Sequence, residues 1–105
     1  MSDSIRIRSD LRDGIARVRT IISHPMETGF SIDPDTGQVK PAHYIREVEC
    51  LHGDRLVLRC SFSRAVSRNP YLAFEFDGAQ AGGRVTIRWR DNRGAEDSAT
   101  VLLGA

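Results

Sequence analysis

Apolar and polar residues alternate with a period of two along almost the whole chain. Near the start, Ile5 and Ile7 alternate with Arg6 and Arg8. The same spacing recurs in four later runs, which are Ala16, Val18, Thr20 and Ile22; Leu56, Leu58, Cys60 and Phe62; Leu72, Phe74 and Phe76; and Val85, Ile87 and Trp89. Such alternation is typical of antiparallel strands with one face on the core and the other in water. No window of helical length shows a 3.6-residue period.

Turn residues such as Asp13-Gly14 and Asn69-Pro70 separate these runs. We therefore predict about seven strands, at residues 4–9, 14–23, 43–51, 56–62, 71–77, 84–91 and 97–103. Regular strands with turns every 8–12 residues or so indicate an all-β sandwich or barrel. The number and length of the strands favour an immunoglobulin-like antiparallel β-sandwich. The Cys…Trp…Cys order of antibody domains is absent, because Trp89 follows both cysteines.

Composition narrows the class of protein. The 105 residues are expected to form one domain, 1–105, and a hydrophobic content of 40% suffices for a single core. The net charge of +1 gives no bias towards nucleic acid or anionic membranes. No run approaches the ~18 apolar residues of a membrane span. The first six residues lack the basic-then-apolar layout of a secretory signal, so we expect no signal peptide of the chain's own.

The two cysteines flank a tight turn, and a register can be derived for them. Burial of the apolar positions pairs Cys50 with Leu58 and Val48 with Cys60, with His52 opposite Leu56. The cysteines are then diagonal neighbours, at roughly 7–8 Å. Bridged cysteines rarely have Cα atoms more than ~6.8 Å apart. We therefore predict two reduced thiols in the core.

The other reactive residue types form no recognisable catalytic or metal-binding pattern. His24, His43 and His52 lack the spacing of zinc ligands, and we interpret them as unrelated surface or loop histidines. The segment from Asp33 to Gly37 lacks the distal glutamate of a calcium loop and predicts a turn. Glu47 and Glu49 share a strand face, which we interpret as two solvent-facing charges. We expect no enzyme, metal or cofactor, because nothing suggests converging groups in a pocket.

Arginines are concentrated on two consecutive strands. Arg6, Arg8, Arg17 and Arg19 are predicted to point outwards and form one positive patch, with a second set at Arg88 and Arg90. Such a patch can guide an acidic partner surface, and it can also prevent edge-to-edge aggregation. Nucleic acid is disfavoured because acidic residues balance the charge and no aromatic residues are interleaved with the arginines.

The loop that follows the second strand is the most distinctive segment of the chain. It runs from His24 through Pro25, Met26, Glu27 and Thr28 to Gly29, and it opens the longest irregular stretch, residues 25–41. Loops of this length in compact domains are usually functional or mobile. Because scaffolds generally carry function on loops, the segment is a candidate recognition site; a plain connecting turn is the alternative.

Two motifs are similar to a known family. The segment Ile22-Ser23-His24-Pro25-Met26-Glu27-Thr28-Gly29, followed by Asp35-x-Gly37 and Pro41-Ala42-His43-Tyr44-Ile45, closely resembles SoxZ, the small subunit of the SoxYZ carrier of thiosulfate oxidation. The segment Ala65-Val66-Ser67-Arg68-Asn69-Pro70-Tyr71-Leu72-Ala73-Phe74-Glu75-Phe76 is similar to the second signature of that family. A generic hairpin, Trp89-Arg90-Asp91-Asn92-x-Gly94, completes the resemblance.

The resemblance implies an immunoglobulin-like sandwich that tightly binds a SoxY subunit. In the family, SoxY carries sulfur intermediates on the cysteine of a C-terminal Gly-Gly-Cys-Gly-Gly arm. This chain ends Val101-Leu102-Leu103-Gly104-Ala105 and has no such arm. It would then be the non-catalytic half of a heterodimer or larger assembly, with transient contacts to other Sox enzymes through the complex. The family also implies a periplasmic location, reached by co-export with a partner that bears a signal.

We predict the partner-binding residues to be His24, Pro25, Met26, Glu27, Thr28, Gly29, Asn69, Pro70 and Tyr71, because methionine and tyrosine are enriched at interfaces. The main alternative is a homo-oligomeric sulfur-carrier accessory that uses its own thiols, Cys50 or Cys60. A stand-alone metal-binding sandwich is a more distant alternative.

Overall fold

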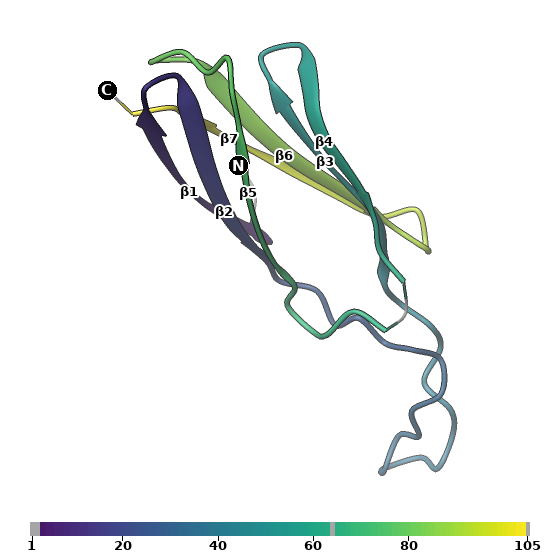
Figure 1. The fold of residues 1–105 in the computed structure, drawn as a ribbon. Coiled ribbons are helices and arrows are strands. Elements are labelled where there is room, and N and C mark those ends of the chain that lie inside the picture. Colours follow the sequence, from purple (N-terminus) through teal and green to yellow (C-terminus); the bar gives the residue numbers. More distant parts are fainter. Residues whose placement is uncertain (1–2, 64, 105) are drawn as a thin grey trace.

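Two antiparallel sheets pack face to face (Figure 1). The computed structural model describes residues 3–63 and 65–104, so Met1, Ser2, Arg64 and Ala105 lie outside it. The described residues form seven strands and no helix: β1 (Ile5–Arg12), β2 (Ile15–Ile22), β3 (Ile45–His52), β4 (Arg55–Ser61), β5 (Tyr71–Phe76), β6 (Arg84–Asp91) and β7 (Glu96–Leu102). One sheet has the order β1-β2-β5 and the other β4-β3-β6-β7. The predicted all-β, immunoglobulin-like sandwich is confirmed, and the strand ends differ from the prediction by a few residues at most.

Strand β2 shows why the alternating pattern produces this fold. Its residues Ala16, Val18, Thr20 and Ile22 are buried, while every residue between them is exposed. Thr20 is accommodated in the core because its hydroxyl donates a hydrogen bond to the Arg6 carbonyl oxygen at 2.9 Å. The rest of the fully buried core is contributed mainly by β3 and β6, through Val48, Cys50, Val85 and Ile87.

The β3–β4 hairpin confirms most of the predicted register. Val48 pairs with Cys60 and Cys50 pairs with Leu58. Beyond Cys50 a β-bulge shifts the pairing, so His52 lies opposite Arg55 and not opposite Leu56 as predicted. A bulge adds one residue to one strand of the pair, and local alternation of residue types does not reveal it. Both cysteines are free thiols, as predicted.

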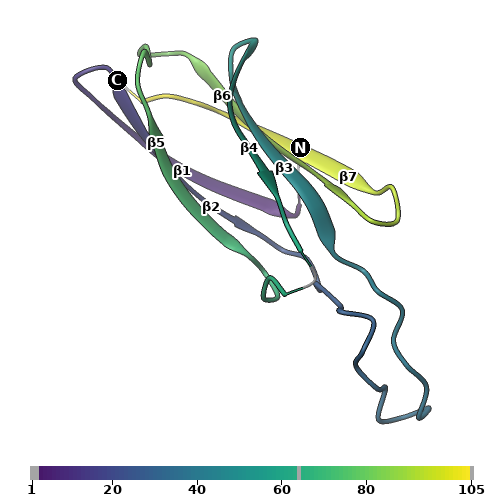
Figure 2. The same ribbon diagram turned by 45° about the vertical axis from the view of Figure 1, so that its right-hand side comes forward.

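Residues 23–44 form an arm that extends beyond one end of the sandwich (Figures 1 and 2). The arm is a narrow antiparallel ribbon, held by isolated bridges between Glu27 and His43 and between Ile32 and Val39. Its tip is the predicted turn, in which the Gly37 N–H donates to the Asp33 carbonyl oxygen at 2.8 Å. The 54 × 20 × 19 Å extents of the molecule reflect this projection.

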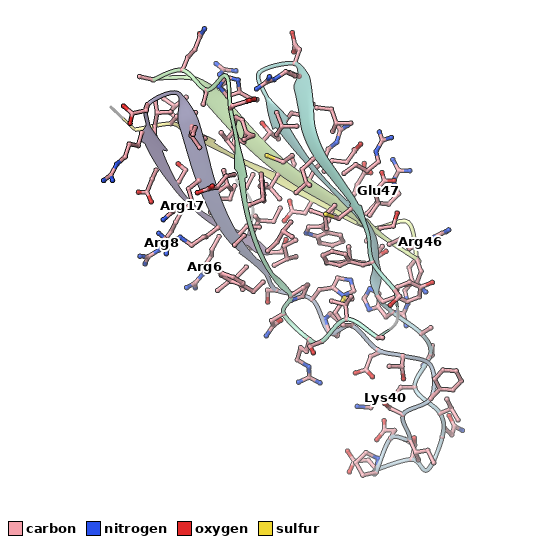
Figure 3. The ribbon with its side chains drawn as sticks, in the orientation of Figure 1. Arg6, Arg8, Arg17, Lys40, Arg46 and Glu47 are labelled. Carbon is pink, nitrogen blue, oxygen red and sulfur yellow. The ribbon has the colours of Figure 1, made fainter. Side chains whose placement is uncertain are left out.

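The outward side of β1 and β2 carries the predicted arginines. Arg6, Arg8 and Arg17 project to the same side, away from the second sheet (Figure 3). Arg8 lies directly opposite Arg19 in the register. We call the exposed side chains Arg6, Arg8, Arg17 and Arg19 the arginine face. Two of its members are partly neutralised, since Arg17 contacts Glu75 at 2.9 Å and Arg19 contacts Asp10 at 3.4 Å.

Residues 3–63 and 65–104 include no helix that is long and apolar enough to cross a membrane.

Candidate functional site

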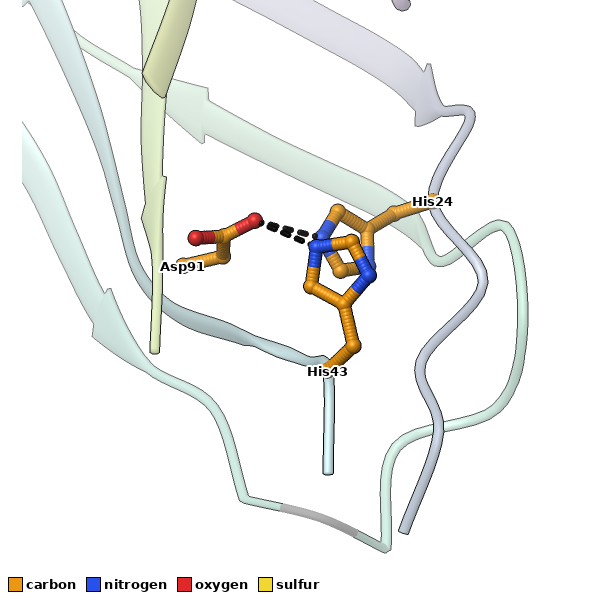
Figure 4. A group of neighbouring side chains, drawn as sticks. All are labelled: His24, His43 and Asp91. Carbon is orange, nitrogen blue, oxygen red and sulfur yellow. Dashed lines mark hydrogen bonds and ion pairs between the residues drawn. The ribbon is translucent and has the colours of Figure 1, made fainter. Parts of the chain in front are cut away.

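Three side chains from distant parts of the sequence meet at the base of the arm (Figure 4). His24 follows the end of β2, His43 precedes β3, and Asp91 is the last residue of β6. The Asp91 Oδ2 atom lies 3.1 Å from the Nε2 atom of His24 and 2.8 Å from that of His43. His24 and Asp91 are 4% and 2% exposed. We call these three residues the histidine–aspartate cluster.

The Asp91 carboxylate joins the arm to the β6–β7 turn. While Oδ2 faces the two histidines, Oδ1 accepts the backbone N–H groups of Arg93 and Ala95, each at 2.9 Å. Burial alone would raise the pKa of Asp91, but the hydrogen bonds from the histidines and the two backbone groups outweigh it and lower the pKa. Asp91 is therefore a buried anion whose four hydrogen bonds hold separate segments together.

The tautomer of His24 follows from its two contacts. Its Nδ1 atom accepts the Met26 backbone N–H at 3.1 Å, so the proton of the neutral ring is on Nε2, which donates to Asp91. Burial lowers the pKa of His24 despite the hydrogen bond to Asp91. The ring also packs edge-on against Trp89, with 5.2 Å between centroids. His24 is a neutral structural residue.

The same hydrogen bonds decide how well the cluster suits a metal. Its possible ligand atoms lie within 4.8 Å of one another, and among the described residues only this group has the makings of a site. A cation on the Nε2 atom of His24 would move the ring proton to Nδ1. That proton would then point at the Met26 N–H, which is a conflict of two buried donors. The donor set fits a hydrogen-bonded clamp and does not fit a metal.

Our interpretation of the histidines as unrelated is wrong for His24 and His43. Their ring centroids are 4.5 Å apart, and they share one carboxylate oxygen. The two residues lie at opposite ends of the arm, which folds back on itself and brings their side chains together. Their separation in sequence is much longer than the short spacing of typical metal ligands, so the sequence pattern did not reveal the contact. His52 is separate, and its ring lies 5.4 Å from that of Phe76.

The two sequence signatures meet beside the cluster. The His24 N–H donates to the Asn69 Oδ1 atom at 3.0 Å, and the Asn69 N–H donates to the His24 carbonyl oxygen at 3.1 Å. One residue further, Pro70 accepts the Ile22 N–H at 3.0 Å. The two segments that resemble the family are therefore in direct contact. The side chain and the backbone of Asn69 both bond to the His24 backbone, and so attach the β4–β5 connection to the base of the arm.

Comparison with family models finds a match over nearly the whole chain. The model described as sulphur oxidation protein SoxZ covers residues 5–102 of the 105. The chain belongs to the SoxZ family. A search of curated proteins returns no match. The match includes the whole arm, both signature segments and all three members of the cluster, so membership of SoxZ assigns the molecule to sulfur oxidation.

The predicted partner-binding residues of this SoxZ chain differ in accessibility. Three are exposed, Pro25, Asn69 and Tyr71; three are partly exposed, Glu27, Thr28 and Gly29; and three are buried, His24, Met26 and Pro70. The Met26 sulfur accepts the Ile45 N–H at 3.3 Å. The buried residues shape the base of the arm from within. Contact of this set with a partner stays a prediction, and it applies to the exposed members.

Both thiols of the SoxZ chain are at least partly buried, which disfavours covalent sulfur chemistry on them. Cys50 is fully buried, and burial raises its pKa to about 12. Cys60 is half-buried, and burial raises its pKa too. Because the thiolate is the nucleophilic form, burial disfavours the reactive state of both cysteines at neutral pH.

The interpretation of Glu49 as a solvent-facing charge is also wrong. Glu49 is 7% exposed. Its Oε2 atom accepts from the Arg59 Nη2 atom at 2.7 Å, and its Oε1 atom accepts from the Arg88 Nε atom at 2.7 Å. The hydrogen bond from Arg59, followed by that from Arg88, lowers the pKa of Glu49. A carboxylate held ionised by two arginines is a poor general acid.

Stability of this SoxZ chain should fall as the pH drops from 7 to 5. The unfolded chain protonates His24 near its ordinary pKa of 6.5, whereas the folded chain has a lower pKa there. The unfolded state therefore binds more protons below pH 6.5, and stability present above this pH is lost. Asp91 adds a second loss below about pH 3.8, because its folded pKa is also lowered. Thermal unfolding between pH 7 and 5 checks this prediction. The wild-type Tm should fall over this range, and the Tm of His24→Gln should fall less steeply with pH. A wild-type Tm that does not change between pH 7 and 5, or an unchanged slope in the variant, would contradict it.

Proposed function

We propose that this chain is the non-catalytic subunit of a sulfur-carrier heterodimer in thiosulfate oxidation. Its partner is a SoxY-like subunit whose C-terminal cysteine arm bears the sulfur intermediates, and other Sox enzymes meet it transiently through that complex. The observation that carries the proposal is the match of the SoxZ family to residues 5–102. The chain's own role is to stabilise the partner and present it to the enzymes that modify the carried sulfur.

The positions of the thiols support this division of roles. A carrier group has to leave one active site and enter another, which requires an accessible thiol on a mobile segment. Cys50 lies within β3 with no exposed surface, and Cys60 lies within β4. Their raised pKa values disfavour the thiolate. These facts weigh against the alternative of a homo-oligomeric accessory that uses its own cysteines.

We also propose that the complex works in the periplasm. The chain would fold first and leave the cytoplasm with a partner that bears a signal. Two free cysteines are compatible with folding in a reducing compartment. Fractionation of cells that express the chain with and without the partner tests this part. Recovery of the chain in the periplasm in both cases would refute co-export.

Mass spectrometry of each thiol during turnover should distinguish the carrier from its support. The chain is co-expressed with a candidate SoxY-like subunit, co-purified and exposed to thiosulfate with the oxidising enzymes. We expect the sulfur adduct on the partner's cysteine, and turnover within about twofold of wild type in Cys50→Ala and Cys60→Ala, because buried high-pKa thiols do not react. An adduct on Cys50 or Cys60, formed as fast as turnover, would establish the alternative. Failure of any SoxY-like subunit to co-purify would refute the heterodimer.

A further inference from the structure

Strand β5 is a sheet edge whose outward backbone groups have no partner among the described residues. The Ile22 N–H donates to the Pro70 carbonyl oxygen, which fixes the phase of the β2–β5 ladder. In an antiparallel pair the hydrogen-bonded positions alternate, so the even-numbered residues of β5 face β2. The free N–H and C=O groups belong to Tyr71, Ala73 and Glu75, and they form a template for another strand.

The other sheet edges carry protection that β5 lacks. Four of the eight residues of β1 are charged, and β1 lies against β7. Strand β4 has arginines at 55 and 59 beside the β3–β4 bulge, and β7 begins with two acidic residues. Charges and bulges of this kind block edge pairing. Between Tyr71 and Phe76, the only charged residue is Glu75, and the strand has no proline, glycine or bulge.

Apolar side chains flank the free edge on both faces of the sheet. On the inner face Leu72, Phe74 and Phe76 are packed on the core yet remain partly exposed. On the outer face Tyr71 is 60% exposed and lies opposite Ile21, which is 46% exposed. A strand added to β5 would remove apolar surface from water on both sides, which favours association.

The small side chain of Ala73 leaves a shallow hollow at the middle of the edge. Its volume is about 310 Å³, and Arg17, Arg19, Ala73, Phe74 and Glu75 line it. Glu75 already pairs with Arg17, whereas Arg19 has only a long 3.4 Å contact to the exposed Asp10. An acidic side chain opposite Ala73 would reach across the hollow to the Arg19 guanidinium, a favourable charge-assisted contact.

We propose that a strand of the partner subunit adds to β5, with apolar side chains on its inner face and an acidic side chain opposite Ala73. The proposal rests on the proposed function, because it names the surface by which the chain binds the sulfur-bearing partner. The main-chain hydrogen bonds of the added strand provide affinity, and its alternate side chains provide specificity. Exposed Tyr71 begins the edge, so the proposed surface continues from the exposed part of the signature segments.

A second copy of the chain fits this edge less well. The only acidic residue of β5, Glu75, is engaged by Arg17 of the same copy. Pairing of two β5 strands would also place two arginine faces on one continuous surface, which adds repulsion between like charges. The partner strand is thus the occupant that these charges favour, and self-association is an outcome that the test has to detect.

Ala73→Pro is the main test. Proline removes an outward N–H and adds bulk at the free edge, but the bonds from β5 to β2 do not use that N–H, so the fold should remain. We expect the variant to bind the co-expressed partner about tenfold more weakly, or worse, since a lost hydrogen bond and a blocked edge together cost at least a tenfold factor. Ala73→Ser keeps the N–H and the small side chain and should bind like wild type.

A charge-matched pair tests the acidic side chain. Arg19→Gln should weaken binding about three- to tenfold, whereas Arg8→Gln, which removes the same charge one strand further from the edge, should change it less than about twofold. Equal effects of the two substitutions would refute the contact at the hollow. In addition, hydrogen exchange of the amides of Tyr71, Ala73 and Glu75 should slow on binding while those of Ile7 and Ser9 on the β1 edge do not.

The outcomes separate the two proposals. If folded Ala73→Pro binds the partner like wild type, strand addition is wrong although the proposed function stands. If the wild-type chain binds no SoxY-like partner, the proposed function itself fails. Sedimentation of the wild-type chain alone is the third measurement. A dimer that Ala73→Pro dissociates would show that a second copy occupies the edge, which would also overturn the inference.

Discussion

Replacing Asp91 by alanine should lower the free energy of unfolding by about 3–5 kcal/mol, because several hydrogen bonds to a buried, ionised carboxylate are lost together. The carboxylate accepts four hydrogen bonds, two from the histidines and two from the β6–β7 turn. Without it the buried Nε2–H of His24 has no acceptor, which alone costs about 1–3 kcal/mol. Both histidines at the base of the arm would then lose their hydrogen bond to the second sheet.

Urea denaturation measures the change in the free energy of unfolding. Two further variants test whether the loss is due to the buried hydrogen bonds of Asp91. Asp91→Asn keeps the size of the side chain, but its amide nitrogen cannot accept hydrogen bonds, so most of the loss should remain. Glu96→Gln alters an exposed ion pair with Arg90 in the same hairpin and should cost less than about 1 kcal/mol. A loss below about 1 kcal/mol in Asp91→Ala would mean that the cluster is not a stabilising clamp.

Met26→Asp should destabilise the chain by more than about 3 kcal/mol, because it buries a carboxylate without a charged partner. Met26 is 5% exposed, and its sulfur accepts the Ile45 N–H. Its backbone φ of 50° does not add to this cost, because aspartate adopts the left-handed region more readily than most residues. Thermal or urea unfolding with far-UV circular dichroism measures the effect, and Met26→Leu, which keeps the apolar volume, should cost less than about 1.5 kcal/mol.

This prediction changes how a binding defect at Met26 has to be interpreted. Loss of partner binding in Met26→Asp would follow from disruption of the arm base and would not identify Met26 as a contact. Tyr71→Ala, at an exposed position, is the informative variant for contact. A folded Met26→Asp with wild-type stability would contradict the burial that underlies this interpretation.

The sheet architecture was predictable because apolar and polar residues alternate along most strands, and this alternation indicates which face of each strand is buried. In β2 and β6 buried and exposed residues alternate largely as the residue types predict. The exceptions are Ile15 and Ile21, which are exposed, and Thr20 and Asp91, which are buried. The β3–β4 register followed from the same rule up to the bulge at Cys50. That register already placed Glu49 opposite Arg59, so one of its ion pairs could have been anticipated. The pairing with Arg88 depends on β3 lying beside β6, which no turn between them specifies.

The site was not predictable by the same means. Asp91 is 67 residues from His24 and 48 from His43, and each belongs to a different loop or strand end. The contact between these three side chains depends on how the two sheets stack and on how the arm folds back to the sandwich. Both are features of the tertiary structure. Resemblance to a family marked segments that contain all three residues, but it did not indicate that their side chains meet. The local spacing of residues cannot predict a contact of this kind.

The joining of three remote segments at a single carboxylate oxygen has a consequence for assembly. Contacts between residues so far apart in sequence form late, because the intervening chain must first be ordered. We therefore expect the base of the arm to acquire its final shape only after both sheets have packed together. A partner that binds this region would therefore bind the fully folded chain in preference to a partly folded one, and association would follow folding.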